Sequence, residues 1–157
     1  MIYIVVDSCL YSLCVYIYLY VGVNGFTLDP RIGEFVLTHP NVRIPPRGRF
    51  YSFNEANQYK WKKSFQRYVS DIKQGKGELG LSYTARYIGS LVGDIHRTLL
   101  YGGIFGYPED TKRPKGKLAL LHEAGPIAFL VEQVLLQLLQ LNMIDIYILT
   151  FIMYFKP

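Results

Sequence analysis

Cysteine is scarce in this chain: its 157 residues include two, Cys9 and Cys14, and both lie among the first 21 residues. A disulfide framework or a cysteine-based zinc site needs several cysteines, so residues 22–133, which contain none, can build neither. Glycine has no regular period, which excludes a collagen-like chain, and an apolar content of 50% excludes a disordered one. The low cysteine content favours a reducing compartment, and we expect the cytoplasm.

Sequence motifs of several common catalytic sites are also missing. The chain has no phosphate loop of the Gly-x-x-x-x-Gly-Lys-Ser/Thr kind, no nucleophile elbow and no zinc-binding helix motif. The pair Gly102-Gly103 follows an apolar stripe and is typical of a helix end rather than of a phosphate loop. These absences exclude function classes without indicating one.

The two ends of the chain differ in composition from its middle. Residues 1–21 hold 18 apolar residues and one charge, Asp7, and residues 134–157 hold 17 apolar residues and two charges. Residues 22–133 carry 16 Lys and Arg against 10 Asp and Glu, a balance typical of a soluble domain with a net charge of +6. We therefore divide the chain into one domain over 22–133 and two hydrophobic segments, 1–21 and 134–157.

The hydrophobic ends give only weak support to a membrane interpretation. No Lys or Arg precedes the uncharged run at residues 8–23, and Gln137, Gln140, Asn142 and Asp145 interrupt the other end. We expect no membrane partner, and a non-catalytic membrane-tethered protein that binds sugar phosphates is the alternative. We expect no nucleic-acid partner either, because the basic residues are dispersed and no recognition motif accompanies them.

Strand and helix patterns alternate along the middle segment. The predicted strands cover 26–28, 34–37, 49–53 and 104–107, an extended piece covers 118–121, and helices cover 55–74, 88–101 and 126–133. The first helix starts after Asn54, a candidate N-cap, and the second has an apolar stripe of Ile88, Leu91, Ile95 and Leu99. This mixture predicts an α/β class, with a mixed α+β sheet and flanking helices.

Cationic and phenolic residues occur at the ends of these predicted elements. Arginine offers a planar fork, lysine a point charge, and tyrosine and asparagine neutral donors, all of which suit a phosphate. The residues of this kind are Asn54, Arg86, Tyr87, Tyr107 and Lys117. Their spacing leaves both a phosphate site and an ordinary basic surface open. Glu123, at a predicted helix start, is either a metal ligand or a carboxylate that complements the helix dipole.

Four stretches of the middle segment carry a family resemblance. They read GVNGFTLDPRIGEFVLTHPNVRIP, YSFNEANQYKW, ARYIGSLVGDIHRTLLYGGIFGYP and GKLALLHEAGPIAFLVEQ, in this order and without large gaps. Together they closely resemble the C-terminal half of fructose-1,6-bisphosphatase, from about Gly22 to Gln133. Both hydrophobic ends fall outside the resemblance.

The resemblance implies a Mg²⁺-dependent phosphatase that removes the 1-phosphate of fructose 1,6-bisphosphate in gluconeogenesis or carbon fixation. It also implies a homotetramer and a cytosolic or plastid location. The family positions that hold the 6-phosphate are matched by Asn54, Tyr87, Tyr107 and Lys117. Arg86 matches an arginine that reaches a neighbouring subunit's site, and Leu91 matches a position near the sugar ring. Glu123 matches a ligand of the catalytic metal.

Two departures from the family pattern limit this implication. After Asn54 the chain has Asn57 where many members have a phosphate-binding tyrosine, and Tyr59 is the nearest candidate to replace it. The family's Asp-Pro-Leu-Asp-Gly motif and an acidic pair, which supply the other metal ligands, do not occur in the sequence. Because phosphoryl transfer of this kind needs two or more cations, we predict that the chain alone has no phosphatase activity. We further expect that residues 1–21 and 134–157 are translated from sequence outside true exons.

Overall fold

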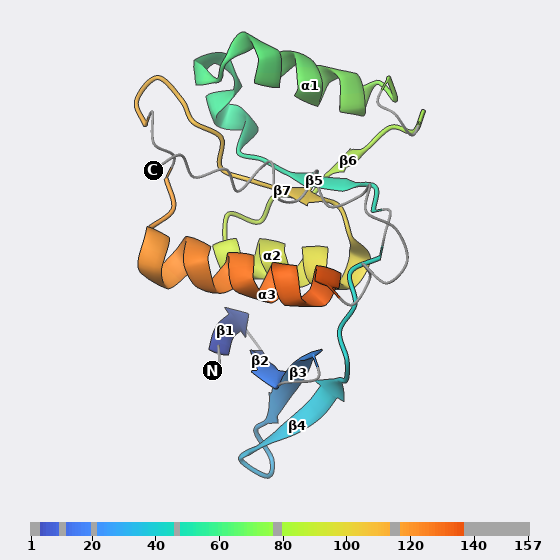
Figure 1. The fold of residues 1–157 in the computed structure, drawn as a ribbon, viewed down its shortest axis with the longest axis vertical. Coiled ribbons are helices and arrows are strands. Elements are labelled where there is room, and N and C mark those ends of the chain that lie inside the picture. Colours follow the sequence, from blue (N-terminus) through green and yellow to red (C-terminus); the bar gives the residue numbers. More distant parts are fainter. Residues whose placement is uncertain are drawn as a thin grey trace.

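The computed structural model of the chain describes residues 4–9, 12–19, 22–45, 48–76, 80–113 and 117–136. The described elements form four layers (Figure 1). Helix α1 (Lys63–Lys73) covers one face of a three-stranded sheet, and helices α2 (Leu91–Tyr101) and α3 (Gly125–Leu136) lie side by side on its other face. A four-stranded sheet lies beyond α2 and α3. The α/β class predicted from the sequence is confirmed, and the described strands form two sheets.

The four-stranded sheet is antiparallel throughout. Its order is β1 (Ile4–Cys9), β2 (Ser12–Leu19), β3 (Gly22–Asp29) and β4 (Glu34–His39). Strands β3 and β4 form the predicted hairpin, whose turn closes where the N–H of Gly33 donates to the carbonyl of Asp29 at 2.9 Å.

The described part of the N-terminal hydrophobic segment belongs to this sheet. Strand β2 pairs with β3 from Leu19↔Gly22 to Cys14↔Thr27, and the side chain of Tyr16 is 1% exposed. The tyrosine, valine and isoleucine of this segment favour strands over helices. Among the residues that the structure describes, no helix is long and apolar enough to cross a bilayer.

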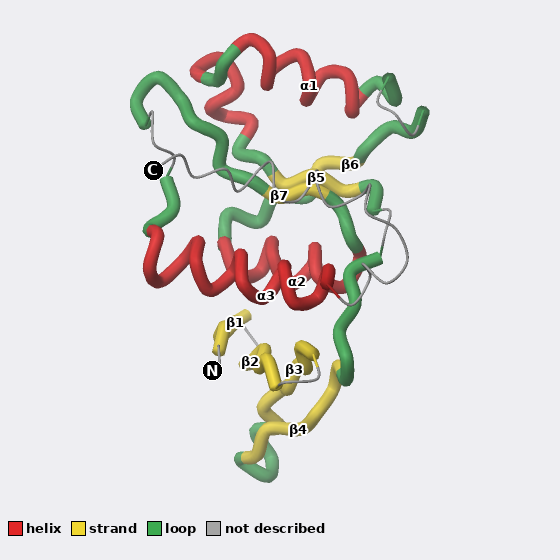
Figure 2. Tube along the Cα trace, in the orientation of Figure 1, coloured by secondary structure: helices red, strands yellow, loops and turns green. Residues whose placement is uncertain are grey.

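The three-stranded sheet is parallel, with the order β6-β5-β7 (Figure 2). Strand β5 (Phe50–Ser52) is shorter than the strand predicted at 49–53, and β7 (Ile104–Phe105) is shorter than the one predicted at 104–107. Strand β6 (Thr84–Ala85) was not predicted, because two residues are too few to show an alternating pattern. Since all three strands run in one direction, their carboxyl ends lie at the same edge of the sheet.

The helix predicted after Asn54 is interrupted. Residues Glu55–Lys60 form a 3-10 helix, η1, and α1 begins only at Lys63. Asn54 caps η1, because its side-chain oxygen accepts the N–H of Ala56 at 3.2 Å. Between the two helices the backbone of Trp61 is extended and bridges to Asp110. Burial of the Trp61 side chain in the aromatic core therefore outweighs the helical pattern.

Two other boundaries differ from the prediction. Ile88 precedes α2 and is 64% exposed, because its N–H donates to the side chain of Asp94 instead of continuing a helix. The α2 helix starts after Ser90, whose hydroxyl accepts the N–H of Gly93 at 3.4 Å. The extended piece expected at 118–121 ends at Ala119, where a π-helical turn, η2 (Leu120–Ala124), leads into α3.

Apolar side chains form two clusters, one on each side of the three-stranded sheet. The first lies among β2, β3, α2 and α3, with Val23, Leu99 and Leu130 at most 1% exposed. The second joins α1 to the sheet through aromatic contacts, such as ring centroids of Phe53 and Phe65 that lie 5.1 Å apart. Burial of such side chains contributes about 1.5–3 kcal/mol each, so the two clusters hold the layers together.

Gly103 directly precedes β7 and lies against the backbone at the start of β5. Its φ is +116°, and a β-carbon added there would lie 2.5 Å from the carbonyl oxygen of Phe50. We predict that Gly103→Ala lowers the free energy of unfolding by about 2–4 kcal/mol, because backbone strain and a backbone clash add together.

Urea denaturation measures this loss, with Gly33→Ala as the control. Gly33 also has a positive φ, of +70°, but nothing lies within 4 Å of its added carbon. The control should therefore lose only the strain energy, about 1–3 kcal/mol at most. Equal losses in the two variants would contradict the close approach at Gly103.

Candidate functional site

The carboxyl edge of the three-stranded sheet brings together residues that are distant in sequence. Asn54 follows β5, Arg86 and Tyr87 follow β6, and Tyr107 follows β7. The parallel register fixes this edge, because Tyr51 pairs with both neighbouring strands. Ligands of α/β proteins commonly bind outside the carboxyl ends of parallel strands, so this edge is the candidate site.

Two tyrosines and a lysine meet at this edge. The hydroxyl oxygens of Tyr87 and Tyr107 lie 3.1 Å apart, and their rings are edge-to-face. The ammonium nitrogen of Lys117 lies 4.9 Å from the centre of the Tyr107 ring, in a cation–π contact. Tyr107 also packs against Phe105, whose ring centroid is 5.5 Å away. Tyr107 therefore contacts two other residues that are expected to bind a phosphate, Tyr87 and Lys117.

The phenol of Tyr107 is held in its neutral form. Burial raises its pKa above the usual value, and the hydrogen bond with Tyr87 and the negative charges of Asp94 and Glu123 raise it further. A neutral phenol keeps its proton and donates it to an acceptor. Tyr107 is therefore a hydrogen-bond donor across the neutral pH range.

The other expected residues of the edge are placed separately. Leu91, the first residue of α2, is half-buried and packs against the same apolar cluster as Tyr107. The exposed guanidinium of Arg86 lies over the Phe50 ring, 5.7 Å from its centre, and so points back along the sheet. Asn54 is occupied with capping η1. The structure brings Tyr87 and Lys117 into contact with Tyr107, whereas Arg86 and Asn54 make other contacts and Leu91 shares only the apolar cluster with Tyr107.

Tyr59 does not replace the tyrosine that the family pattern leads us to expect at Asn57. Its side chain is 84% exposed on η1 and lines a separate pocket between η1 and α1. Asn57 instead accepts a hydrogen bond from the ammonium group of Lys60 at 2.7 Å.

A buried acid clamps the segment that carries Arg86 and Tyr87. The carboxylate of Asp94 is 0% exposed and accepts the N–H groups of Ile88, at 3.1 Å, and Gly89, at 3.2 Å. It also pairs with Arg97 at 2.7 Å. Peptide groups just beyond Tyr87 are thus fixed from α2.

The other side of Tyr87 is held from the same helix. A guanidinium nitrogen of Arg97 donates to the carbonyl of Arg86 at 2.7 Å, and the hydroxyl of Ser52 donates to that same carbonyl. Asp94 and Arg97 were not predicted from the sequence as supports of the site. The available signal was an acid in the first turn of an apolar helix with an arginine three residues later, a pair that can meet on one helix face.

Glu123 lies in η2, where one carboxylate oxygen accepts the N–H of Ala119 at 2.6 Å. This contact uses one of the two carboxylate oxygens. Mg²⁺ requires several oxygen ligands in octahedral geometry. Within the described ranges, no group of three or more His, Cys, Asp or Glu side chains could hold a metal ion. Glu123 alone therefore does not make a complete magnesium site.

Comparison with known proteins identifies the family. Residues 44–135, more than half of the chain, match the family described as fructose-1-6-bisphosphatase, C-terminal domain. The chain belongs to this family of phosphoric monoester hydrolases, which acts in carbohydrate metabolism. The sequence resemblance is thereby confirmed.

Relatives and solved structures agree with this. The chain is 56% identical over 127 residues to fructose-1,6-bisphosphatase 1, chloroplastic, of Arabidopsis thaliana, a match that covers 80% of this chain and 30% of that protein. It is 53% identical over 113 residues to fructose-1,6-bisphosphatase of Saccharomyces cerevisiae, covering 71% and 32%. The crystal structure of Leishmania major fructose-1,6-bisphosphatase in holo form matches with a TM-score of 0.74 and 52% identity, covering 79% of this chain and 37% of that one. The chain thus spans about a third of the length of these relatives.

The Asp94 clamp generates a stability prediction. We expect Asp94→Ala to lower the free energy of unfolding by about 3–5 kcal/mol, because it leaves Arg97, whose side chain is only 16% exposed, without its counter-ion. Asp71→Ala is the matched control, since Asp71 pairs with Arg67 at 3.8 Å on the surface and should cost about 1 kcal/mol or less. Urea denaturation measures both losses, and a similar small loss in the two variants would show that Asp94 does not hold this segment in place.

Proposed function

We propose that the carboxyl edge binds the 6-phosphate of fructose 1,6-bisphosphate. The contact among Tyr87, Tyr107 and Lys117 is the observation that carries this proposal. One hydroxyl of the Tyr87–Tyr107 pair donates to the other, so the pair has one proton left for a phosphate oxygen, and the ammonium group of Lys117 offsets the phosphate charge. Membership of the fructose-1,6-bisphosphatase family and the names of the relatives support the choice of sugar phosphate.

The remaining residues complete the proposed binding site. Leu91 offers an apolar surface near the sugar ring, and Asn54 contributes an amide at the start of η1. Arg86 is exposed on the surface, which supports a role in the site of a neighbouring subunit of a homotetramer. The Asp94 clamp keeps the backbone around Tyr87 fixed, so binding requires little reorganisation of this segment.

We propose that hydrolysis of the 1-phosphate is the reaction of the family and that this chain alone does not perform it. When bound, Mg²⁺ would generate the attacking hydroxide and neutralise the developing charge. Glu123 would provide one ligand through the oxygen that does not bind Ala119. The described residues supply no further set of carboxylates for the metal, so they bind and orient substrate without cleaving it.

The compartment is proposed as the cytoplasm, with the plastid as the alternative. The plant relatives, which are named chloroplastic, support the plastid. The low cysteine content favours a reducing compartment but does not distinguish the cytoplasm from the plastid.

Substrate binding is tested with Lys117→Met. We expect fructose 6-phosphate to bind the full chain and to bind Lys117→Met about tenfold more weakly, because a charge-assisted hydrogen bond is lost. Lys112→Met is the matched control, since Lys112 is an exposed lysine in the turn after Asp110. Isothermal titration calorimetry gives the affinities. Equal affinity in the two variants would separate Lys117 from the phosphate.

Catalysis is tested on the same preparation. We expect the full chain with fructose 1,6-bisphosphate and Mg²⁺ to release inorganic phosphate no faster than the buffer does, since Glu123 alone cannot hold the two cations that the reaction needs. We expect a chelator to leave the binding of fructose 6-phosphate unchanged. Phosphate release that depends on Mg²⁺ and stops with the chelator would overturn this part of the proposal.

A further inference from the structure

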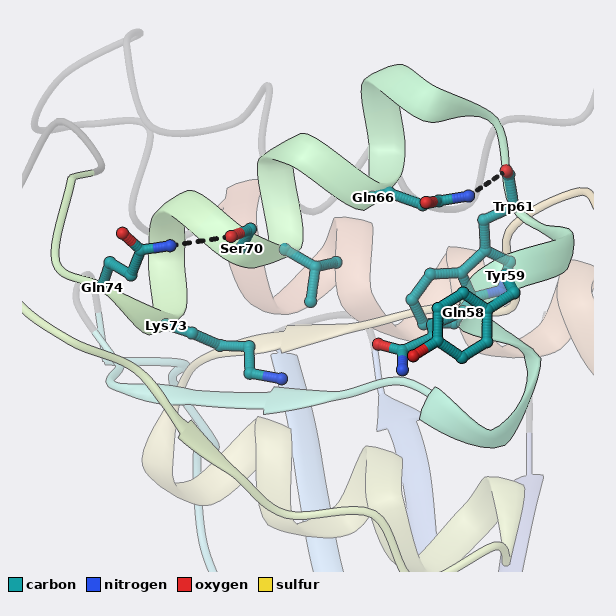
Figure 3. A pocket seen from close by; sticks show the side chains of 8 residues that line it. Gln58, Tyr59, Trp61, Gln66, Ser70, Lys73 and Gln74 are labelled. Atoms are coloured by element: carbon teal, nitrogen blue, oxygen red, sulfur yellow. Dashed lines mark hydrogen bonds between the residues drawn. The ribbon is translucent and has the colours of Figure 1, made fainter.

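A second pocket, of about 290 Å³, lies between η1 and α1 (Figure 3). Tyr59 and Trp61 line one end, and Ser70 and Gln74 line the other. None of its lining residues belongs to the phosphate-binding set proposed above. The volume is close to the lower end of the range for small-molecule sites, about 300–1,000 Å³, and so suits a single ring.

Side-chain amides give this pocket unused hydrogen-bond acceptors. The Nε2 of Gln66 donates to the backbone carbonyl of Trp61 at 2.8 Å. Because a carbonyl only accepts, this contact fixes the orientation of the amide and leaves Oε1 for another donor. The Nε2 of Gln74 donates to the hydroxyl of Ser70 at 2.8 Å; because a hydroxyl can also donate, this contact alone does not fix the orientation of the Gln74 amide. Among the described residues, none donates to either Oε1.

The pocket has no net charge to attract an anion. Lys73 is its one charged lining residue, and its ammonium nitrogen lies 2.7 Å from a carboxylate oxygen of Glu55. Burial acts to raise the pKa of Glu55, but hydrogen bonds from Lys73 and Tyr51 outweigh it and lower the pKa below the usual value. Glu55 therefore stays ionised and neutralises Lys73. A phosphate, which needs an unpaired cation, fits this pocket poorly.

Two aromatic side chains supply the apolar part of the wall. Trp61 is 5% exposed and forms the base of this end, whereas Tyr59 is 84% exposed at its rim. A ligand that suits the pocket therefore combines an apolar ring face with groups that donate hydrogen bonds.

We propose that this pocket binds a neutral, hydroxyl-rich ring of monosaccharide size. Its hydroxyl groups donate to the Oε1 atoms of Gln66 and Gln74, while its C–H face lies against the aromatic wall. Gln58, whose side chain also lines the pocket and has no partner among the described residues, offers a third amide. This site goes beyond the proposed function, because it uses none of the residues that hold the phosphate.

The chain provides its own reporter for the test, because Trp61 is its single tryptophan. We expect D-glucose or D-fructose, added to the full chain, to change Trp61 emission saturably, and calorimetry to give the same affinity. Gln66→Met and Gln74→Met should each bind about 3- to 10-fold more weakly, which is the loss of one neutral hydrogen bond. Gln133→Met, the same change on α3, is the matched control and should bind as the unmodified chain does.

Three results would overturn the proposal. The first is no saturable response to either sugar, and the second is equal affinity in Gln66→Met, Gln74→Met and Gln133→Met. The third is a change in Trp61 emission that follows protein concentration without sugar, together with dimers in sedimentation velocity, which would make the pocket an interface between copies. Saturating fructose 6-phosphate should not displace the sugar, so failure at one site is distinguishable from failure at the other.

Discussion

The buried carboxylate of Asp94 fixes the backbone on both sides of Tyr87, directly at Ile88 and Gly89 and through Arg97 at Arg86. The Asp94 side chain is fully buried, and hydrogen bonds from two backbone N–H groups and the ion pair with Arg97 offset the cost of burying its charge. Through Arg97 the same network reaches the carbonyl of Arg86 and the hydroxyl of Ser52 on β5. The position of Tyr87, which follows the two-residue strand β6, therefore depends on contacts from α2 as well as on the sheet.

Parallel pairing of β5, β6 and β7 brings the residues that follow these strands to the same edge of the sheet. Three short strands bring three distant parts of the chain to one edge, and each strand ends directly before residues that can contact a ligand. The strands are too short to be stable alone, so the helices on both faces must hold them. Binding chemistry at the edge is thus tied to the packing of both apolar clusters.

Sequence patterns predicted the parts of this structure that local interactions determine. The β3–β4 hairpin follows from the turn at Asp29–Gly33, and the cap at Asn54 from its side chain alone. The break at Trp61 could not be predicted, because it arises from burial among residues far away in the sequence. Residue chemistry supplied the phosphate candidates and the resemblance added Leu91 near the sugar ring. The role of Asp94 needed coordinates, since two of its partners are backbone N–H groups that carry no sequence signal.

The order of the elements along the chain has a consequence for biosynthesis. The four-stranded sheet is complete by His39, but the helices that cover it comprise residues 91–101 and 125–136. On the ribosome, at about 5–20 residues per second, the sheet waits several seconds for its cover. Until α2 and α3 emerge, the apolar side chains around Val23 lack the helices that bury them in the folded chain, and such surface is prone to association.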